Sequence, residues 1–258
     1  MTGEKTPKVI LSREGAILIV TINRPESRNA IDRETSLALA EAMDQLDNDP
    51  TLSLAILTGA GEHFCAGMDL KAFVAGERVE LSGRGLAGIT QKPPAKPLIA
   101  AIEGYALAGG FEIALACDLI VASETARFGL PEAKRGLIAG SGGLVRLPEC
   151  MPRQIAMECA LTGRMIPAAE AERWGLINRL CLPGAALDTA RDLAGEIARN
   201  APMSLVASKQ IVAHAGRWSE DNVWPRQNEI LEKVIHSEDA KEGARAFAEK
   251  RNPVWTGR

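Results

Sequence analysis

Short apolar runs that alternate with helical stretches constrain the fold of this chain more than any other feature of its sequence. Runs rich in apolar and β-branched residues, each ended by glycine, proline or a polar residue, predict strands within residues 15–25, 52–61, 96–107 and 118–123. Between the first two runs, apolar side chains recur at helical spacing, with Asp32 as the predicted N-cap and Pro50 as the terminator. Strands that alternate with helices predict an α/β protein.

The pattern of apolar strand, glycine turn and helix recurs weakly, at intervals of about 40–50 residues, which is compatible with a spiral of supersecondary units. Residues 74–97, with mixed periodicity and two consecutive prolines, predict a mobile loop with at most one helix, a kind of segment that often shapes a pocket. From about Arg153 the chain becomes almost entirely helical, without a disordered linker. We therefore expect a core at residues 1–198 and a C-terminal helical region at residues 199–258.

Composition argues against several classes of function. Of the 258 residues, 46% are hydrophobic and 24% are charged, and the formal net charge is −3. This balance is ordinary for a globular protein and does not imply a nucleic-acid partner. No apolar stretch reaches the roughly 18 uncharged residues that a membrane-spanning helix needs. Residues 1–15 lack the apolar core of a signal peptide, and the five cysteines form no C-x-x-C pair, so we expect a soluble cytoplasmic protein.

Residues 63–73, "HFCAGMDLKAF", are the first of three segments that could carry chemistry. An Ala-Gly turn after an apolar strand exposes the backbone N–H groups of the residues that follow it. The alternative is an ordinary turn at the end of a strand. His63 has no histidine partner at ligand spacing, because His214 and His236 lie in the helical tail, and we expect no metal site.

Residues 106–115, "ALAGGFEIAL", place Glu112 in a run that is otherwise apolar until Asp118. An unpartnered buried carboxylate would cost about 2 kcal/mol or more, so this residue calls for an explanation. Gly109 and Gly110 at a helix start would let an oxygen atom approach free backbone donors, and with the first turn they could form an oxyanion hole. The alternative is that the glycines allow close packing and Glu112 occupies a favourable first helical turn.

Residues 126–143, "ARFGLPEAKRGLIAGSGG", place Glu132 after a proline and before a cluster of glycines. The cluster is not a dinucleotide-binding fingerprint, because no G-x-G-x-x-G follows a strand, and no phosphate-binding lysine motif is present. Taken by itself, the segment favours an acidic surface turn.

Read together and in this order, these segments resemble the enoyl-CoA hydratase/isomerase (crotonase) superfamily. The resemblance covers essentially the whole chain, in the stretches "INRPESRNAID", "FCAGMDLKAF", "KPLIAAIEGYALAGGFEIALACDLIVAS", "ARFGLPEAKRGLIAGSGGLVRLP", "LTGRMIPAAEAERWGLIN" and "SEDAKEGARAFAEKR". It implies a crotonase-like spiral of β-β-α units followed by a helical C-terminal region. It also implies homotrimers or hexamers, in which residues 199–258 mediate oligomerisation and cover the active site.

The resemblance implies that the enzyme stabilises an enolate of a coenzyme A thioester. The thioester oxygen would lie between the N–H groups of Met68 and Gly109, where fixed dipoles oppose the developing charge. Glu112 would direct the reacting water and Glu132 would transfer the α-carbon proton, with the division of roles left open. Gly140 matches the position whose N–H helps to hold that water.

The family likeness also implies contacts with coenzyme A, which is part of the substrate, so no separate cofactor is expected. Candidates near the first strand loop and the A-G-x-D turn are Arg28, Ala30, Ala66, Met68, Asp69, Leu70 and Gly109. Lys250 matches a C-terminal lysine that reaches the nucleotide phosphate across a subunit boundary. For the charged candidates Arg28 and Lys250, a solvated surface charge is the equally plausible alternative.

Retention of both glutamates favours an enoyl-CoA hydratase, which adds water reversibly to a trans-2-enoyl-CoA and gives a 3-hydroxyacyl-CoA. Two alternatives on the same scaffold are a carnitinyl-CoA-type dehydratase and an enoyl-CoA isomerase. A non-catalytic relative that binds acyl-CoA or RNA is a third, although it would need a basic surface that the composition does not indicate. Acyl chain length and ring content of the substrate are not evident from the sequence.

Overall fold

A six-stranded sheet forms the centre of the computed structural model, which describes residues 6–258. Its order is β1-β2-β3-β4-β6-β9, and all neighbouring strands are parallel except the β1–β2 hairpin. The strands are β1 (Val9–Glu14), β2 (Ile17–Ile22), β3 (Leu54–Gly59), β4 (Leu98–Ile102), β6 (Leu119–Ser123) and β9 (Arg179–Cys181). The first five residues of the N-terminal stretch assessed for a signal peptide lie outside the described residues.

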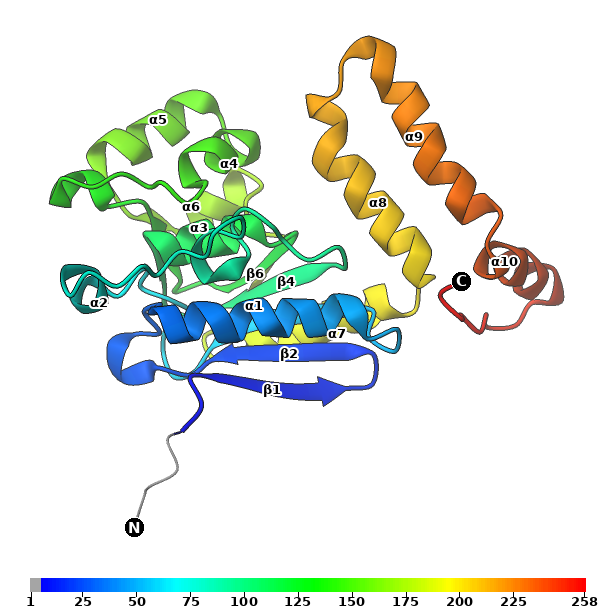
Figure 1. The fold of residues 1–258 in the computed structure, drawn as a ribbon, viewed down its shortest axis with the longest axis horizontal. Helices are drawn as coiled ribbons and strands as arrows, with labels where there is room; N and C mark the ends of the chain where they lie inside the picture. Colours follow the sequence, from blue (N-terminus) through cyan, green and yellow to red (C-terminus); the bar gives the residue numbers. More distant parts are fainter. Residues whose placement is uncertain (1–5) are drawn as a thin grey trace.

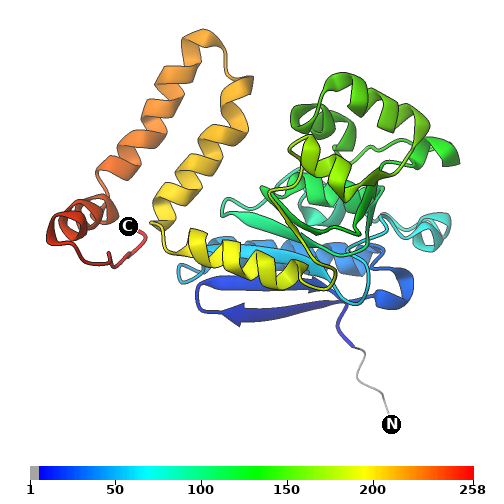
Figure 2. The same cartoon turned by 180° about the vertical axis from the view of Figure 1, so that it is seen from behind.

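Both faces of this sheet are covered, which explains why its strands are apolar runs rather than alternating ones. Leu54 and Ile56 of β3 pack with Ala190 and Ala194 of helix α7 (Ala186–Ala198) on one face. The intervening residue Ala55 belongs to the larger cluster on the other face. Figure 2 shows α7 lying across the back of the sheet, opposite α1.

Helix α1 (Arg33–Asn48) confirms the clearest of the helix predictions. The Asp32 side chain accepts a hydrogen bond from the Thr35 N–H and caps the helix, and the helix ends two residues before Pro50. Leu39, Met43 and Leu46 are buried, as their helical spacing predicts. The α/β fold predicted from the strand and helix pattern is confirmed.

A second, smaller sheet holds the elements that surround the candidate site. It consists of β5 (Tyr105–Leu107), β7 (Arg127–Gly129) and β8 (Ile166–Pro167), none of which was predicted as a separate strand. The helical elements around it are α2 (Leu70–Val74), α3 (Gly109–Ala116), α4 (Gly143–Cys150), α5 (Arg153–Thr162), α6 (Ala168–Arg173) and the 3-10 turns at Pro25–Ser27, Leu86–Gly88 and Glu132–Arg135. Residues 74–97 contain little regular structure beyond the turn at Leu86–Gly88, as expected from their mixed periodicity.

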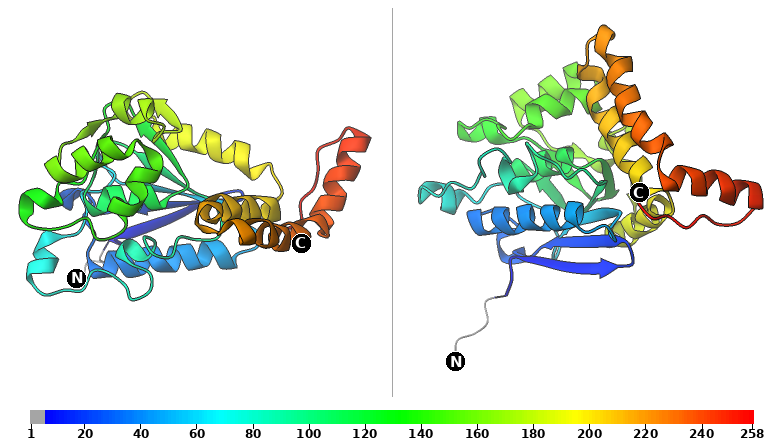
Figure 3. Two further views of the ribbon diagram at one scale, coloured as in Figure 1. Left: turned by 90° about the horizontal axis from the view of Figure 1, so that it is seen from above. Right: turned by 45° about the vertical axis from the view of Figure 1, so that its right-hand side comes forward.

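The C-terminal helices project away from the core as an arm (Figures 1 and 3). The arm comprises α8 (Pro202–His214), a 3-10 turn (Ala215–Arg217), α9 (Glu220–Ile235) and α10 (Glu238–Glu249). Several of its large apolar side chains are exposed in the single chain, among them Val212 and Phe247. The predicted boundary near residue 198 coincides with the end of α7, whereas the predicted role of the arm in oligomerisation stays a prediction. Among the described helices, none is long and apolar enough to cross a membrane.

Candidate active site

The turn that follows β3 and the start of α3 bring two backbone N–H groups together. Gly67 has a φ of +101°, and a Cβ built on it would lie 2.9 Å from the Gly109 nitrogen. A Cβ on Gly109 would in turn lie 3.3 Å from the Met68 nitrogen. Within residues 6–258, neither the Met68 N–H nor the Gly109 N–H donates to a protein acceptor. Two unpaired donors therefore lie side by side, an arrangement suited to one anionic oxygen.

The residue before α3 adopts an unusual backbone conformation that sets the direction of these donors. Ala108 has φ +50° and ψ −129°, which costs a non-glycine residue on the order of 1–3 kcal/mol. It is held there because its N–H donates to the Gly129 carbonyl at 2.8 Å and its carbonyl accepts the Glu112 N–H at 3.0 Å. The positive end of the α3 dipole adds to the potential at Gly109.

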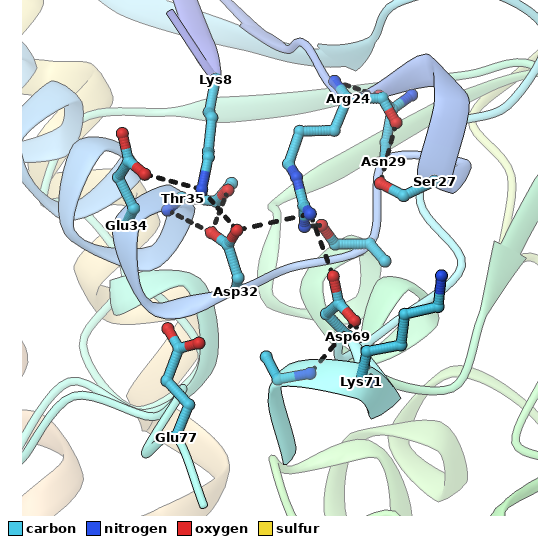
Figure 4. A network of polar contacts seen from close by, with 12 residues as sticks. Lys8, Arg24, Ser27, Asn29, Asp32, Glu34, Thr35, Asp69, Lys71 and Glu77 are labelled. Atoms are coloured by element: carbon cyan, nitrogen blue, oxygen red, sulfur yellow. Dashed lines mark hydrogen bonds and ion pairs between the residues drawn. The ribbon is translucent and has the colours of Figure 1, made fainter. Parts of the chain in front are cut away.

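A network of charges fixes the turn that carries Met68 (Figure 4). Asp69 caps α2 by accepting from the Lys71 N–H at 3.0 Å, and Arg24 donates to the other Asp69 oxygen at 3.0 Å. Arg24 also pairs with Asp32, which in turn binds Lys8 at 2.6 Å. Partial burial raises the pKa of Asp69, but the Arg24 hydrogen bond and the helix cap outweigh burial and keep that pKa below its ordinary value. The Asp69 side chain is thus engaged in holding the turn, and its predicted contact with coenzyme A stays a prediction.

The two glutamates singled out in the sequence lie near each other in the fold. Glu112, in the first turn of α3, is 3% exposed, and its Oε1 accepts a hydrogen bond from the Gly143 N–H at 2.8 Å. Glu132, at the start of its 3-10 turn, is 9% exposed, and its Oε2 has no hydrogen-bond partner within the described residues. The charge of Glu132 acts on Glu112, so the two carboxyl groups are electrostatically coupled.

Burial governs the protonation of both carboxyl groups. Loss of solvent raises the pKa of Glu112 to about 7; the Gly143 N–H opposes this shift, and the charge of Glu132 adds to it. Burial also raises the pKa of Glu132, with the positive charge of Arg135 acting in the opposite direction. A carboxyl group with a pKa near 7 exchanges protons readily at neutral pH, which is the property required of a general acid or base.

A cavity of about 470 Å³ adjoins the Glu132 carboxyl group. Its walls come from the Glu132 turn, α4 and α5, and apart from Glu132 and Arg153 they are apolar, with Ile138, Leu144 and Leu161 as examples. Within the single chain, no residue of the α8–α10 arm lines it. The predicted covering of the active site by residues 199–258 is therefore not made by this chain on this cavity.

A sequence model described as enoyl-CoA hydratase/isomerase matches residues 12–258. The chain belongs to this family. An enoyl-CoA hydratase from Mycobacterium marinum has a crystal structure with a TM-score of 0.96 and 57% identity, over 98% of this chain and 100% of that chain. A carnitinyl-CoA dehydratase from Salmonella enteritidis is 46% identical over 256 residues, covering 96% of this chain and 98% of the relative. A carnitinyl-CoA hydratase from Mycobacterium avium has a TM-score of 0.79 and 44% identity, over 98% of this chain and 100% of that chain.

Membership of the enoyl-CoA hydratase/isomerase family and the structural neighbours confirm the crotonase-like fold with its helical C-terminal region. By the family resemblance, the unpaired N–H groups of Met68 and Gly109 are the predicted oxyanion hole, and Glu112 and Glu132 are the predicted acid–base pair; these roles stay predictions. Within residues 6–258, no group of three or more His, Cys, Asp and Glu side chains is arranged to hold a metal ion.

The remaining coenzyme A candidates of the family pattern fall into two groups. Ala66 and Leu70 flank the first donor, and Arg28, whose carbonyl accepts the Ala66 N–H at 2.9 Å, lies with Ala30 on the adjacent loop. Lys250 lies at the C-terminus of α10, at the far end of the molecule from α2 (Figure 1). One chain thus assembles the first group but not Lys250, whose predicted role requires a second subunit.

Sequence reasoning missed the residue that contacts Glu112 directly. That residue is Gly143, the first residue of α4, a helix that was not predicted. The signal available was a glycine pair directly before an apolar helical stretch. Gly140, predicted to hold the reacting water through its N–H, lies three residues earlier in an exposed part of the loop, and this role stays a prediction.

Proposed function

We propose that the chain is a hydro-lyase that interconverts a 3-hydroxyacyl-CoA and the corresponding trans-2-enoyl-CoA, and that it is of the carnitinyl-CoA dehydratase type. The observation that carries this proposal is the coupled pair Glu112 and Glu132 beside the unpaired N–H groups of Met68 and Gly109. Hydration and dehydration need two proton-transfer groups at neighbouring carbons and a hydrogen-bonding site for the thioester oxygen. An isomerase, in contrast, needs only one such acid–base group.

In the direction of dehydration, the thioester oxygen accepts hydrogen bonds from Met68 and Gly109. The Glu132 carboxylate removes the proton from C2, and the resulting negative charge moves onto the oxygen between the two donors. The protonated Glu112 carboxyl group then gives its proton to the C3 hydroxyl group, the C3–O bond breaks, and water leaves. In hydration the same steps run in reverse, so Glu112 must start as a carboxylate and accept a proton from water.

The acyl group is the finer part of the proposal. A carnitinyl group carries a hydroxyl on C3 and a quaternary trimethylammonium on C4, and the 46%-identical relative from Salmonella enteritidis is named for this substrate. A straight-chain enoyl-CoA hydratase is the second candidate, favoured by the name of the 57%-identical protein from Mycobacterium marinum. Under either reading we propose a cytoplasmic homotrimer or hexamer with no cofactor beyond the coenzyme A of its substrate.

The test offers the purified protein carnitinyl-CoA, 3-hydroxybutyryl-CoA and crotonyl-CoA and follows the absorbance of the conjugated enoyl thioester. We expect carnitinyl-CoA to lose one water and to be converted more efficiently than 3-hydroxybutyryl-CoA. Preferred turnover of the uncharged substrates would support the second candidate instead. Movement of a double bond in a 3-enoyl-CoA without any exchange of water would contradict both.

The pH dependence of hydration should follow the ionisation of Glu112. Because this residue accepts a proton from water, and because burial raises its pKa to about 7, kcat/KM should fall as the pH drops below about 7. A pH–rate profile of crotonyl-CoA hydration measures this decrease of kcat/KM at low pH. An acid limb near 4.5, the ordinary pKa of the group, would show that Glu112 is not the base.

A Gly143→Ala substitution should impair catalysis without unfolding the protein. The added Cβ would lie 2.9 Å from Glu112 Cγ and 3.1 Å from its Oε1, so the carboxyl group must shift from its hydrogen bond. We expect kcat to fall about tenfold and the stability to fall by about 1–3 kcal/mol. Gly216→Ala, where a Cβ meets nothing within 4 Å, should change neither quantity and serves as the control. Unchanged kcat in Gly143→Ala would remove this glycine from the site.

A further inference from the structure

A third carboxyl group stands beside the glutamate pair and has no part in the mechanism above. Glu80, on the loop that precedes the turn at Leu86–Gly88, accepts a hydrogen bond at its Oε1 from the Ser141 hydroxyl group at 2.6 Å. Ser141 lies two residues before Gly143, whose N–H binds Glu112. The glycine-rich loop before α4 therefore holds Glu80 and Glu112 at neighbouring positions.

The negative charge of Glu80 is not neutralised by the protein. Among residues 6–258, no lysine, arginine or histidine forms an ion pair with it, and Ser141 engages only one of its two oxygens. Its charge reaches the catalytic pair, because it contributes to the raised pKa of Glu112. Arg146 lies within electrostatic range of Glu112, but its guanidinium group donates to the Thr90 carbonyl at 2.6 Å.

Three carboxyl groups in one small region, two of them buried, favour a ligand that brings positive charge. Hydroxylated or straight neutral acyl chains supply none. A quaternary ammonium group does, and since it has no N–H to donate, it interacts with a carboxylate through charge alone. Glu80 is exposed, and its Oε2 accepts no hydrogen bond from the described part of the protein, so it can face such a group without breaking a contact within the fold.

We propose that Glu80 is a specificity residue, whose carboxylate binds a quaternary ammonium group on C4 of the acyl chain. This inference rests on the proposed function, in which C3 reacts beside Glu112. Only one methylene group separates C3 from the ammonium nitrogen in a carnitinyl group, so the cation must lie close to Glu112. The Ser141 hydroxyl group holds Glu80 against the same loop whose Gly143 N–H binds Glu112.

The test compares two unreactive analogues of equal shape and different charge, 4-(trimethylammonio)butanoyl-CoA and its carbon isostere 5,5-dimethylhexanoyl-CoA. Calorimetric titration gives the dissociation constant of each with the wild-type protein. We expect the cationic analogue to bind about fivefold or more tightly than the neutral one, as a partly exposed ion pair allows. Added salt should narrow the difference, because the interaction is electrostatic.

Glu80→Gln should abolish this preference while leaving the affinity for the neutral analogue unchanged. Glu77→Gln is the matched control, since Glu77 lies on the same loop but accepts its hydrogen bond from the Arg33 N–H at the start of α1. It should retain the preference. Equal weakening of both analogues by Glu80→Gln would show that Glu80 only anchors the loop and would overturn the inference, as would a wild-type protein without any preference.

These measurements can contradict the hydro-lyase proposal or the role of Glu80 independently of each other, because binding of unreactive analogues does not depend on turnover. A wild-type protein that hydrates crotonyl-CoA but binds both analogues equally overturns the role of Glu80 and leaves the hydro-lyase proposal intact. A protein that shows the Glu80-dependent preference but exchanges water with none of the thioesters contradicts the hydro-lyase proposal and supports the cation site.

Discussion

Replacing Glu112 with glutamine should lower kcat for hydration and dehydration about a hundredfold or more. The amide keeps the size of the side chain, and its oxygen can still accept the Gly143 N–H, so the geometry is retained. It can neither accept a proton from water nor return one to a C3 hydroxyl group, and positioned acid–base groups contribute about 10²–10⁴-fold. Steady-state rates with crotonyl-CoA and carnitinyl-CoA measure the loss.

Two further variants show whether such a loss comes from chemistry. Glu132→Gln should lose a comparable factor, because the C2 proton then has no base, whereas the exposed Glu124→Gln should behave as wild type. Thermal unfolding at pH 8 should find Glu112→Gln at least as stable as wild type, since burial disfavours the ionised carboxylate that it replaces. A loss of less than tenfold in both Glu112→Gln and Glu132→Gln would contradict the assigned roles.

Replacing Gly110 with alanine should destabilise the fold severely. A Cβ at this position would lie 2.1 Å from the Cys65 carbonyl oxygen and 2.7 Å from its carbon, both of them backbone atoms that cannot rotate away. To remove these steric overlaps, α3 would have to move away from the turn that carries Met68. We expect the free energy of unfolding to fall by about 3 kcal/mol or more, at the upper end of the range for overpacked cores.

Gly195→Ala provides the contrast, because Gly195 lies within α7 and an added Cβ meets nothing within 4 Å. Alanine is favoured over glycine inside a helix by about 1 kcal/mol, so this variant should be as stable as wild type or more stable. Urea denaturation of the two variants and the wild type measures both effects. A Gly110→Ala protein with wild-type stability would mean that the two donor segments are not packed as closely as described.

Local signals in the sequence were sufficient for the elements that carry their own start and stop residues. Asp32 and the apolar spacing that follows it predicted α1, and the apolar runs predicted β2, β3, β4 and β6. The hairpin strand β1 was missed, because its side chains are mostly exposed and it lacks the apolar run of its neighbour. The three-residue strands were missed because pairing with distant strands, rather than composition, defines them.

In the candidate site, too, some relationships follow from local sequence and others depend on residues that are distant in the chain. Gly109 and Glu112 share one helical turn, so their proximity follows from sequence spacing. The contact between Glu112 and Gly143 joins residues 31 positions apart, and no local pattern contains it. The contact of the Asp69 side chain with Arg24 likewise joins residues that are distant in the chain, and only the three-dimensional arrangement reveals it.

In the proposed reaction, the Gly109 N–H that binds the thioester oxygen and the acid–base group of Glu112 belong to one helix, so their positions differ by three residues of rise, about 4.5 Å along the axis. If this reaction is correct, C1 and C3 of every thioester substrate meet their partners at one spacing. Different acyl groups must then be accommodated by residues outside α3. Amino-acid changes in the loop that carries Glu80, and in the apolar cavity walls contributed by α4 and α5, should therefore disturb catalysis least.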